Sequence, residues 1–160
     1  MQSPVGYRDG PASSKVEATQ KRRILTEAAI MIIFDNPATV PAPAGAYSHV
    51  ARAELGDKTI LQLSGQAAID AEGNIVGGND VAAQAEYIMD NITAILAAHG
   101  ATLADVVNIR AYITDMSRLS EYGKVRAARF TGTPPTVTTV EVSRLFVSGA
   151  LLEVEVLAIT

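Results

Sequence analysis

The C-terminal stretch Thr133–Ala158, TPPTVTTVEVSRLFVSGALLEVEVLA, decides which class of fold the chain adopts. Its two halves alternate with a period of two and are rich in β-branched residues, and a turn at Val147–Gly149 separates them. This pattern predicts two β-strands. One face of the second strand would be apolar, made of Leu152, Val154, Val156 and Ala158.

The opposite face of the second strand carries two carboxylates. Glu153 and Glu155 would lie about 7 Å apart on one side of the sheet. In the first strand, Val137, Thr139 and Glu141 share one face. We expect any chemistry to take place on the face that holds the two carboxylates.

The length, net charge and composition of the chain exclude several classes of function. A chain of 160 residues suits one domain, and its net charge of -4 gives no footprint for nucleic acid. No apolar run approaches the ~20 residues of a membrane span. Without cysteine and with two histidines, neither disulfides, thiol chemistry nor a histidine-rich metal site is expected. We expect a cytoplasmic protein that meets small molecules and its own copies, with no nucleic acid or membrane partner.

Residues 1–30 differ in composition from the rest of the chain. Their first part is rich in Ser, Pro, Gly and charge, which predicts a flexible arm ahead of one domain, residues 31–160. Lys21–Ile33 resembles a signal peptide, but Glu27 interrupts its apolar run and no cleavage site follows, so secretion is not expected. Met31 as the natural start is an alternative that the intact mass of the native protein would decide.

The middle of the chain predicts a hairpin, a helix, a strand and a second helix. Gly56–Asp57 joins two strands, and the second ends at Ser64-Gly65-Gln66. A helix over residues 81–99 would start at Asn79 or Asp80 and end at Gly100. Its apolar positions would be Ala85, Ile88, Ile92, Ile95 and Leu96. A strand over residues 104–114 follows. Asp115 or Ser117 would begin the second helix, whose inward residues would be Leu119, Tyr122, Val125 and Phe130.

The order β-β-α-β-α-β-β predicts an α+β fold with two helices on one face of a mixed sheet. We expect Val137, Leu151 and Leu157 on the other face, among Thr and Glu residues. A sheet face of this mixed character needs a partner surface, and a homo-oligomer that closes sheet onto sheet is the simplest solution.

These pieces together resemble the reactive intermediate deaminase (Rid, YjgF-like) family. The resemblance rests on motifs that run in order from about Asn36 to the C-terminus: Pro43–Ser48, Ser64-Gly65-Gln66, Asp80–Gln84 with Asn91, Pro135–Val142 and Ala150–Glu155. It implies a chorismate-mutase-like fold, a homotrimer and a pocket between subunits that uses no cofactor.

The resemblance also implies a chemistry and a set of site residues. Family members hydrolyse reactive enamines and imines to keto acids and ammonia. By resemblance, Glu153 handles the water or the proton, while Tyr47, Ser64 and Gly65 line the pocket. Thr139 would orient water, although it is equally a normal strand residue. Glu153 could likewise be a solvated carboxylate, and Tyr47 an interface aromatic.

Two positions depart from the family pattern. Val137 stands where the family has the arginine that binds the substrate carboxylate, a contact that guanidinium makes well. Gly123 stands where many members carry a pocket asparagine. Both departures predict a divergent branch with a more apolar pocket and a different substrate.

Three functions remain open from the sequence. The first is cofactor-free hydrolysis of a small enamine, imine or related C–N compound. The second is a non-catalytic trimer that binds or senses a small metabolite. The third is the family's older label of ribonuclease or translation inhibitor, which this acidic chain gives no reason to favour.

Overall fold

The computed structural model describes residues 30–160. Residues 1–29 of the arm expected over residues 1–30, with most of the signal-like segment, therefore lie outside the described residues. Among residues 30–160, no helix is both long and apolar enough to cross a membrane.

The described chain folds into a mixed sheet with the order β1-β2-β3-β7-β5-β6, and the short β4 pairs with β7. The strands are β1 (Met31–Asp35), β2 (Val50–Leu55), β3 (Lys58–Leu63), β4 (Gln66–Ala67), β5 (Val106–Ile113), β6 (Thr136–Glu141) and β7 (Leu152–Ile159). β5 and β6 are parallel and the other pairs are antiparallel. β7 lies at the centre of the sheet and is separated from β6 by β5.

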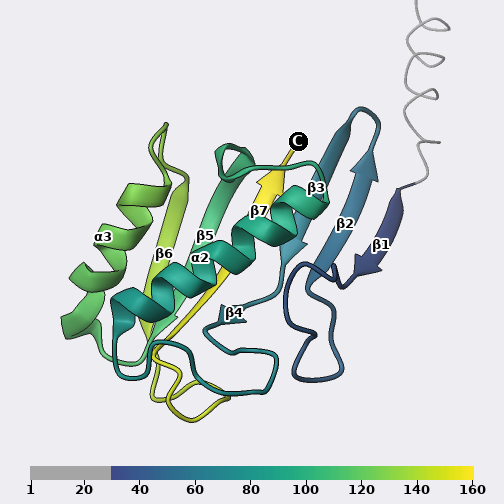
Figure 1. Ribbon diagram of the computed structural model, residues 1–160. Coiled ribbons are helices and arrows are strands. Elements are labelled where there is room, and N and C mark those ends of the chain that lie inside the picture. The colour runs from purple at the N-terminus through teal and green to yellow at the C-terminus, as the bar shows by residue number, and fades with distance from the viewer. Residues whose placement is uncertain (1–29) are drawn as a thin grey trace, which may run out of the picture.

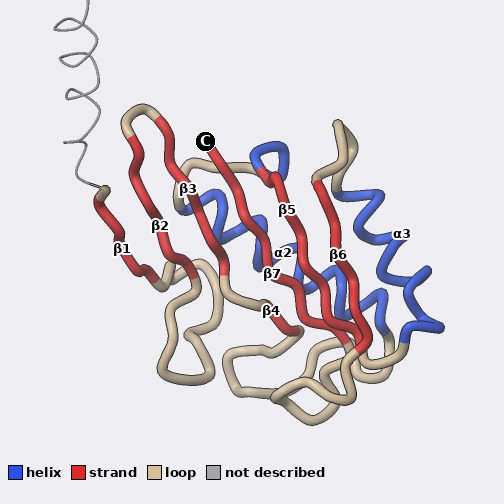
Figure 2. The backbone as a smooth tube through the Cα atoms, turned by 180° about the vertical axis from the view of Figure 1, so that it is seen from behind, coloured by secondary structure: helices blue, strands red, loops and turns tan. Residues whose placement is uncertain are grey.

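Two helices, α2 (Val81–Ala98) and α3 (Leu119–Arg129), cover one face of this sheet (Figure 1). Seen from behind, the strands lie in front, and no helix within residues 30–160 covers them (Figure 2). The expected α+β fold with two helices on one face is confirmed. The open second face is the one that a partner would have to cover.

The apolar faces predicted from periodicity form the core. The four apolar residues of β7, Leu152, Val154, Val156 and Ala158, are buried, as are the five predicted apolar positions of α2. Asp80 caps α2 by accepting a hydrogen bond from the amide of Ala83 at 3.0 Å. Gly100 has φ 72° just after the helix, a left-handed conformation that glycine adopts without strain.

The second helix begins later in the chain than a cap at Asp115 would predict. Asp115 caps a 3-10 turn, η2 (Met116–Arg118), and α3 follows it. Tyr122 and Val125 are buried as predicted, whereas Leu119 is exposed and Phe130 half-buried, so the inward set was only partly right.

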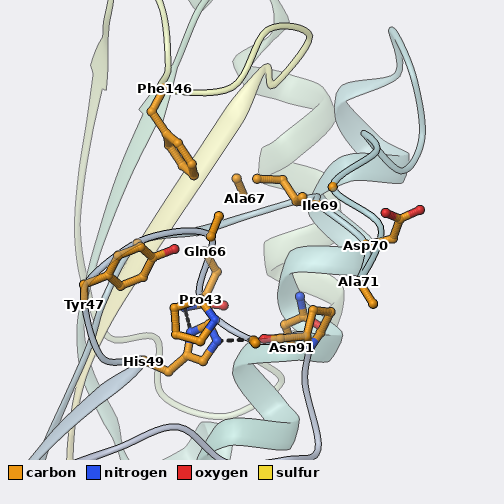
Figure 3. Close-up of a pocket in the computed structure, with 15 residues that line it drawn as sticks. Pro43, Tyr47, His49, Gln66, Ala67, Ile69, Asp70, Ala71, Asn91 and Phe146 are labelled. Carbon is orange, nitrogen blue, oxygen red and sulfur yellow. Dashed lines mark hydrogen bonds between the residues drawn. The ribbon is translucent and has the colours of Figure 1, made fainter.

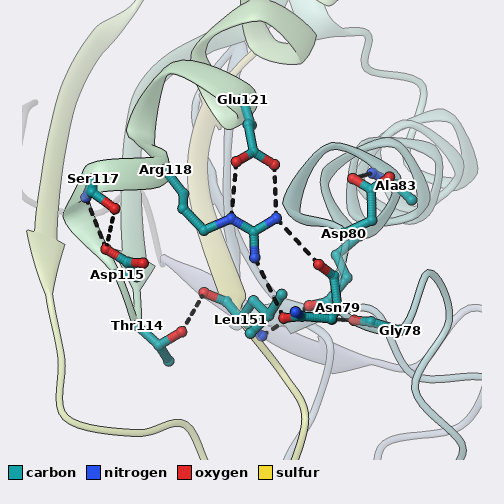
Figure 4. Close-up of polar contacts among 11 residues, drawn as sticks. Gly78, Asn79, Asp80, Ala83, Thr114, Asp115, Ser117, Arg118, Glu121 and Leu151 are labelled. Atoms are coloured by element: carbon teal, nitrogen blue, oxygen red, sulfur yellow. Dashed lines mark hydrogen bonds and ion pairs between the residues drawn. The ribbon is translucent and has the colours of Figure 1, made fainter.

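Arg118 connects the beginnings of the two helices (Figure 4). Its guanidinium forms a bidentate pair with Glu121, at 2.9 and 2.8 Å, and donates to the carbonyl of Asn79 at 3.2 Å. Because Asn79 lies directly before Asp80, this contact holds the start of α3 near the start of α2.

Two strands were not predicted. β1 comes from the apolar run that resembles a signal peptide, and it pairs antiparallel with β2. β4 has two residues, too few for any periodicity. One expectation was wrong: Val137 pairs with Ile109, which is buried beneath the helices, so Val137 lies on the helix side of the sheet. Alternation along one strand cannot say which face is covered, because the register against β5 decides it.

Gln84 ties the loop before β7 to helix α2. It is fully buried and donates to the carbonyls of Gly78 and Gly149 at 2.7 and 2.9 Å, and its Oε1 accepts from the amide of Leu151 at 2.9 Å. These three bonds fix the end of the segment that carries Phe146.

Candidate functional site

A cavity of about 250 Å³ lies where β3 and β4 meet the loops that precede β2 and follow β4 (Figure 3). Its walls come from Pro41–Ala44, Tyr47, His49, Gly65–Ala67, Ile69–Ala71, Gly73, Asn91 and Phe146. The predicted residues Tyr47 and Gly65 are among them. Prolines at 41 and 43 keep the entry segment extended, and α2 presents Asn91 from below.

Glu153 lies directly against Gly65. A Cβ added at Gly65 would lie 2.0 Å from Oε1 of Glu153, much closer than two such atoms can approach. The pairing of β4 with β7 creates this contact, because Ala67 stands opposite Glu153. The glycine, which lines the cavity, therefore makes room for the carboxylate directly behind it.

The environment of Glu153 favours its protonated form. Burial raises the pKa of this carboxyl, and the negative charge of Glu155 raises it further. A raised pKa makes a carboxyl group better suited to act as a general acid or base. The catalytic role of Glu153 stays a prediction.

Two buried side chains at the cavity floor, Gln66 and His49, share a hydrogen bond that fixes the tautomer of the histidine ring. Nε2 of Gln66 donates to the carbonyl of Ser64 at 3.0 Å and lies 3.2 Å from Nδ1 of His49. Nδ1 must therefore accept. The proton of the ring lies on Nε2, which donates to the carbonyl of Pro41 at 2.8 Å. His49 is thus a neutral imidazole in this arrangement.

A second hollow of about 360 Å³ opens on the uncovered face of the sheet, lined by Phe34, Tyr47, Ser48, Ala51, Gln62–Ser64, Arg110 and Glu155. Tyr47 lines both this hollow and the cavity. Oε1 of Glu155 accepts from Arg110 and from the hydroxyl of Tyr112, each at 3.1 Å. The hydroxyl of Ser64 donates to the carbonyl of Ser48 at 2.7 Å, which leaves Ser64 as a wall residue.

The structure does not bring every predicted residue together within one chain. Tyr47, Ser64, Gly65 and Glu153 lie around the junction of β3, β4 and β7. Val137 and Thr139 lie on edge strand β6, and their register places them on the opposite face from Glu153. They can meet Glu153 only across a subunit boundary, so their part in the site stays a prediction.

Other cavity residues were missed by the sequence reasoning. Gln66 and Asn91 appeared there only as parts of motifs, His49 was given no role, and Phe146 carried no periodic or spacing signal. Arg110, which lines the second hollow, was missed as well. Glu141 accepts from the amide of Met116 at 2.7 Å.

Comparison with known proteins assigns the chain to a family. The family model described as Endoribonuclease L-PSP matches residues 38–160. The chain belongs to this family. The L-PSP family includes the Rid (YjgF-like) and RutC proteins, so the resemblance found in the sequence motifs is confirmed at the level of the family.

Three L-PSP family relatives illustrate the similarity. A RutC family protein of Saccharolobus solfataricus is 38% identical over 127 residues, which cover 79% of this chain and 95% of that protein. The 2-iminobutanoate/2-iminopropanoate deaminase of Escherichia coli is 33% identical over 125 residues, 76% of this chain and 94% of that protein. The crystal structure of RidA from an Antarctic Psychrobacter has a TM-score of 0.69 at 30% identity, covering 79% and 98% of the two chains.

Proposed function

We propose that this protein is a cofactor-independent deaminase, which hydrolyses a small reactive enamine, imine or related C–N compound in a pocket between the subunits of a homotrimer. The observation that carries the proposal is the carboxyl of Glu153, half-buried against Gly65 beside an open cavity. Relatives named as 2-iminobutanoate/2-iminopropanoate deaminases support the same type of reaction.

The chemistry needs one water molecule and one group that moves protons. For a protonated imine, R–CH=NH₂⁺ + H₂O gives R–CHO + NH₄⁺. The carboxylate of Glu153 takes a proton from the attacking water as its oxygen bonds to the imine carbon. The same carboxyl then delivers that proton to nitrogen. As the C–N bond breaks and the carbonyl forms, the carboxylate takes the hydroxyl proton and passes it to the departing ammonia, which leaves as NH₄⁺. The raised pKa of Glu153 suits both halves of this cycle.

Trimer formation would complete the pocket. Tyr47 and Phe146 border the cavity while 41% and 61% exposed, a large exposure for aromatic side chains at a ligand site. On the open face, Phe34 is 69% and Val140 40% exposed. Packing of copies through this face would bury these groups and bring β6, with Val137 and Thr139, to a neighbouring cavity.

Ammonia release tests the proposal. Imines are generated in place from amines or amino acids by an oxidase, and the protein is added as wild type or as Glu153→Gln. We expect the wild type to accelerate ammonia release for at least one imine, and the variant to lose most of that acceleration. Indistinguishable rates for the two proteins on every imine would refute the enzymatic function.

Val137 favours a second candidate. By the sequence resemblance it stands where the family has its carboxylate-binding arginine, as it would in a trimer that binds a metabolite without converting it. Binding of a small neutral compound without turnover, unaffected by Glu153→Gln, would support that function.

A further inference from the structure

We infer that the cavity beside Glu153 selects imines that carry no carboxylate, in their neutral or protonated form. This inference rests on the proposed function and concerns the substrate class of the same site. It follows from the charges and hydrogen-bonding groups that line the cavity.

The cavity wall lacks a cation. Among the described residues, no lysine or arginine lines it, and its one histidine is the neutral His49. Position 137, which the family resemblance places in the pocket, brings a valine. A carboxylate that enters this space would lose its water shell without gaining a charged partner, which is strongly unfavourable.

The acidic side chain on the cavity wall, among the described residues, is Asp70. It accepts hydrogen bonds from the amides of Asn74 and Glu72, which lower the pKa of this carboxyl and keep it ionised. Its negative charge repels an anion and attracts a protonated imine. Glu153 lies behind Gly65 and does not itself line the cavity.

The floor of the cavity carries a hydrogen-bond acceptor, Oε1 of Gln66, to which no group of the described residues donates. Gln66 is 4% exposed, and its Nε2 is occupied by Ser64 and His49. Its Oε1 accepts no hydrogen bond from residues 30–160 and is therefore available to a ligand that supplies an N–H group. The amide of Asn91, which likewise makes no side-chain hydrogen bond within the described chain, adds a neutral partner beside it.

The remaining wall is apolar, formed by Pro41, Pro43, Ile69 and Phe146 with alanines between them. An imine N–H can face Gln66 while its hydrocarbon part packs on these side chains. The geometry thus suits the imine of an aldehyde or ketone better than a 2-imino acid.

Matched pairs of imines test this inference. The imine of phenylacetaldehyde, generated from phenethylamine by an amine oxidase, differs from that of phenylpyruvate, generated from phenylalanine by an amino-acid oxidase, only by the carboxylate. Propylamine and 2-aminobutanoate supply a smaller pair. We expect kcat/KM for the carboxylate-free member to be higher by about ten- to a hundredfold, the range set by one missing charge-assisted contact. Val137→Arg should shift this preference toward the acid, while Val137→Met should not.

The outcomes separate this inference from the proposed function. Glu153-dependent hydrolysis of the imino acids with none of the carboxylate-free imines would overturn the inference and leave the deaminase function standing. Two arginines, Arg110 and Arg144, line neighbouring hollows. If Arg110→Met or Arg144→Met abolished hydrolysis of an imino acid, that arginine would be the carboxylate anchor and the inference would be wrong. No hydrolysis of either class would refute the deaminase function itself.

Discussion

The carboxyl of Glu153 occupies the space that a side chain at position 65 would need: a Cβ there would lie 2.0 Å from Oε1 and 2.9 Å from Cγ of the glutamate. The glycine is therefore required for the position of the acid, and its own backbone φ is not in the left-handed region. Because the backbone at position 65 does not itself need glycine, a side chain there should displace Glu153 without disturbing the fold of the turn.

Gly65→Ala should lower activity without unfolding the protein. The glutamate side chain is flexible and can rotate away, so the free energy of unfolding should change by less than about 1 kcal/mol. We expect kcat/KM to fall at least about tenfold, the low end for removing a positioned acid or base. Gly132→Ala, at a glycine where a Cβ meets nothing within 4 Å, is the matched control and should keep full activity.

Glu153 should make stability depend on pH in a defined direction. Its folded-state pKa is raised, so it contributes most to stability when protonated, below its ordinary pKa, and that contribution is lost as pH rises through the folded value. Glu153→Gln should therefore raise the melting temperature at pH 8 and change it little at pH 4. Thermal unfolding between these pH values measures the difference. Glu72→Gln, on an exposed loop, should show no such trend, and the same trend in both variants would contradict the assignment.

Gln84→Met should destabilise the fold through its hydrogen bonds. The change keeps the volume of the side chain but leaves the carbonyls of Gly78 and Gly149 and the amide of Leu151 without partners in a buried place. We expect a loss of about 2–4 kcal/mol in urea unfolding, since each unsatisfied group costs about 1–3 kcal/mol. Gln62→Met, at a half-buried glutamine, should cost less than half of that. Equal losses would contradict the role assigned to the three hydrogen bonds of Gln84.

The open face of the sheet should be the surface through which copies associate. Light scattering on the wild type should give three chain masses of 16.8 kDa each. Leu157→Glu places a charge on the open face beside Gln62 and Asn108 and should yield monomers that remain folded by circular dichroism. Lys124→Glu, on the exposed side of α3, should leave the trimer intact. A monomeric wild type would contradict the proposed intersubunit pocket.

Periodicity in the sequence was enough to predict most of the fold. The alternation of Leu152, Val154, Val156 and Ala158 identified the central strand, and the helical spacing in residues 81–99 identified the helix that covers it. The face of Val137 could not be predicted, because it depends on the parallel register between β5 and β6, two strands joined by a helix. β1 was hidden because its apolar residues do not alternate.

The sequence allowed candidate site residues to be named, but it did not show which of them lie in contact. Glu153 and Gly65 were both identified, yet they are 88 positions apart and their contact arises from the two-residue pairing of β4 with β7. The hydrogen bond between Gln66 and His49 forms only after folding brings the two side chains together. No local pattern signals a hydrogen bond of that kind, so the neutral floor of the cavity could not be foreseen.

The central claim is that the carboxyl of Glu153, held by Gly65, performs the proton transfers, and a double-mutant cycle tests it most directly. kcat/KM for ammonia release is measured for the wild type, Gly65→Ala, Glu153→Gln and the double variant on the best imine. If both residues act through one carboxyl, the double variant should be no slower than Glu153→Gln alone. Losses that multiply, or a Glu153→Gln variant as fast as the wild type, would contradict the claim.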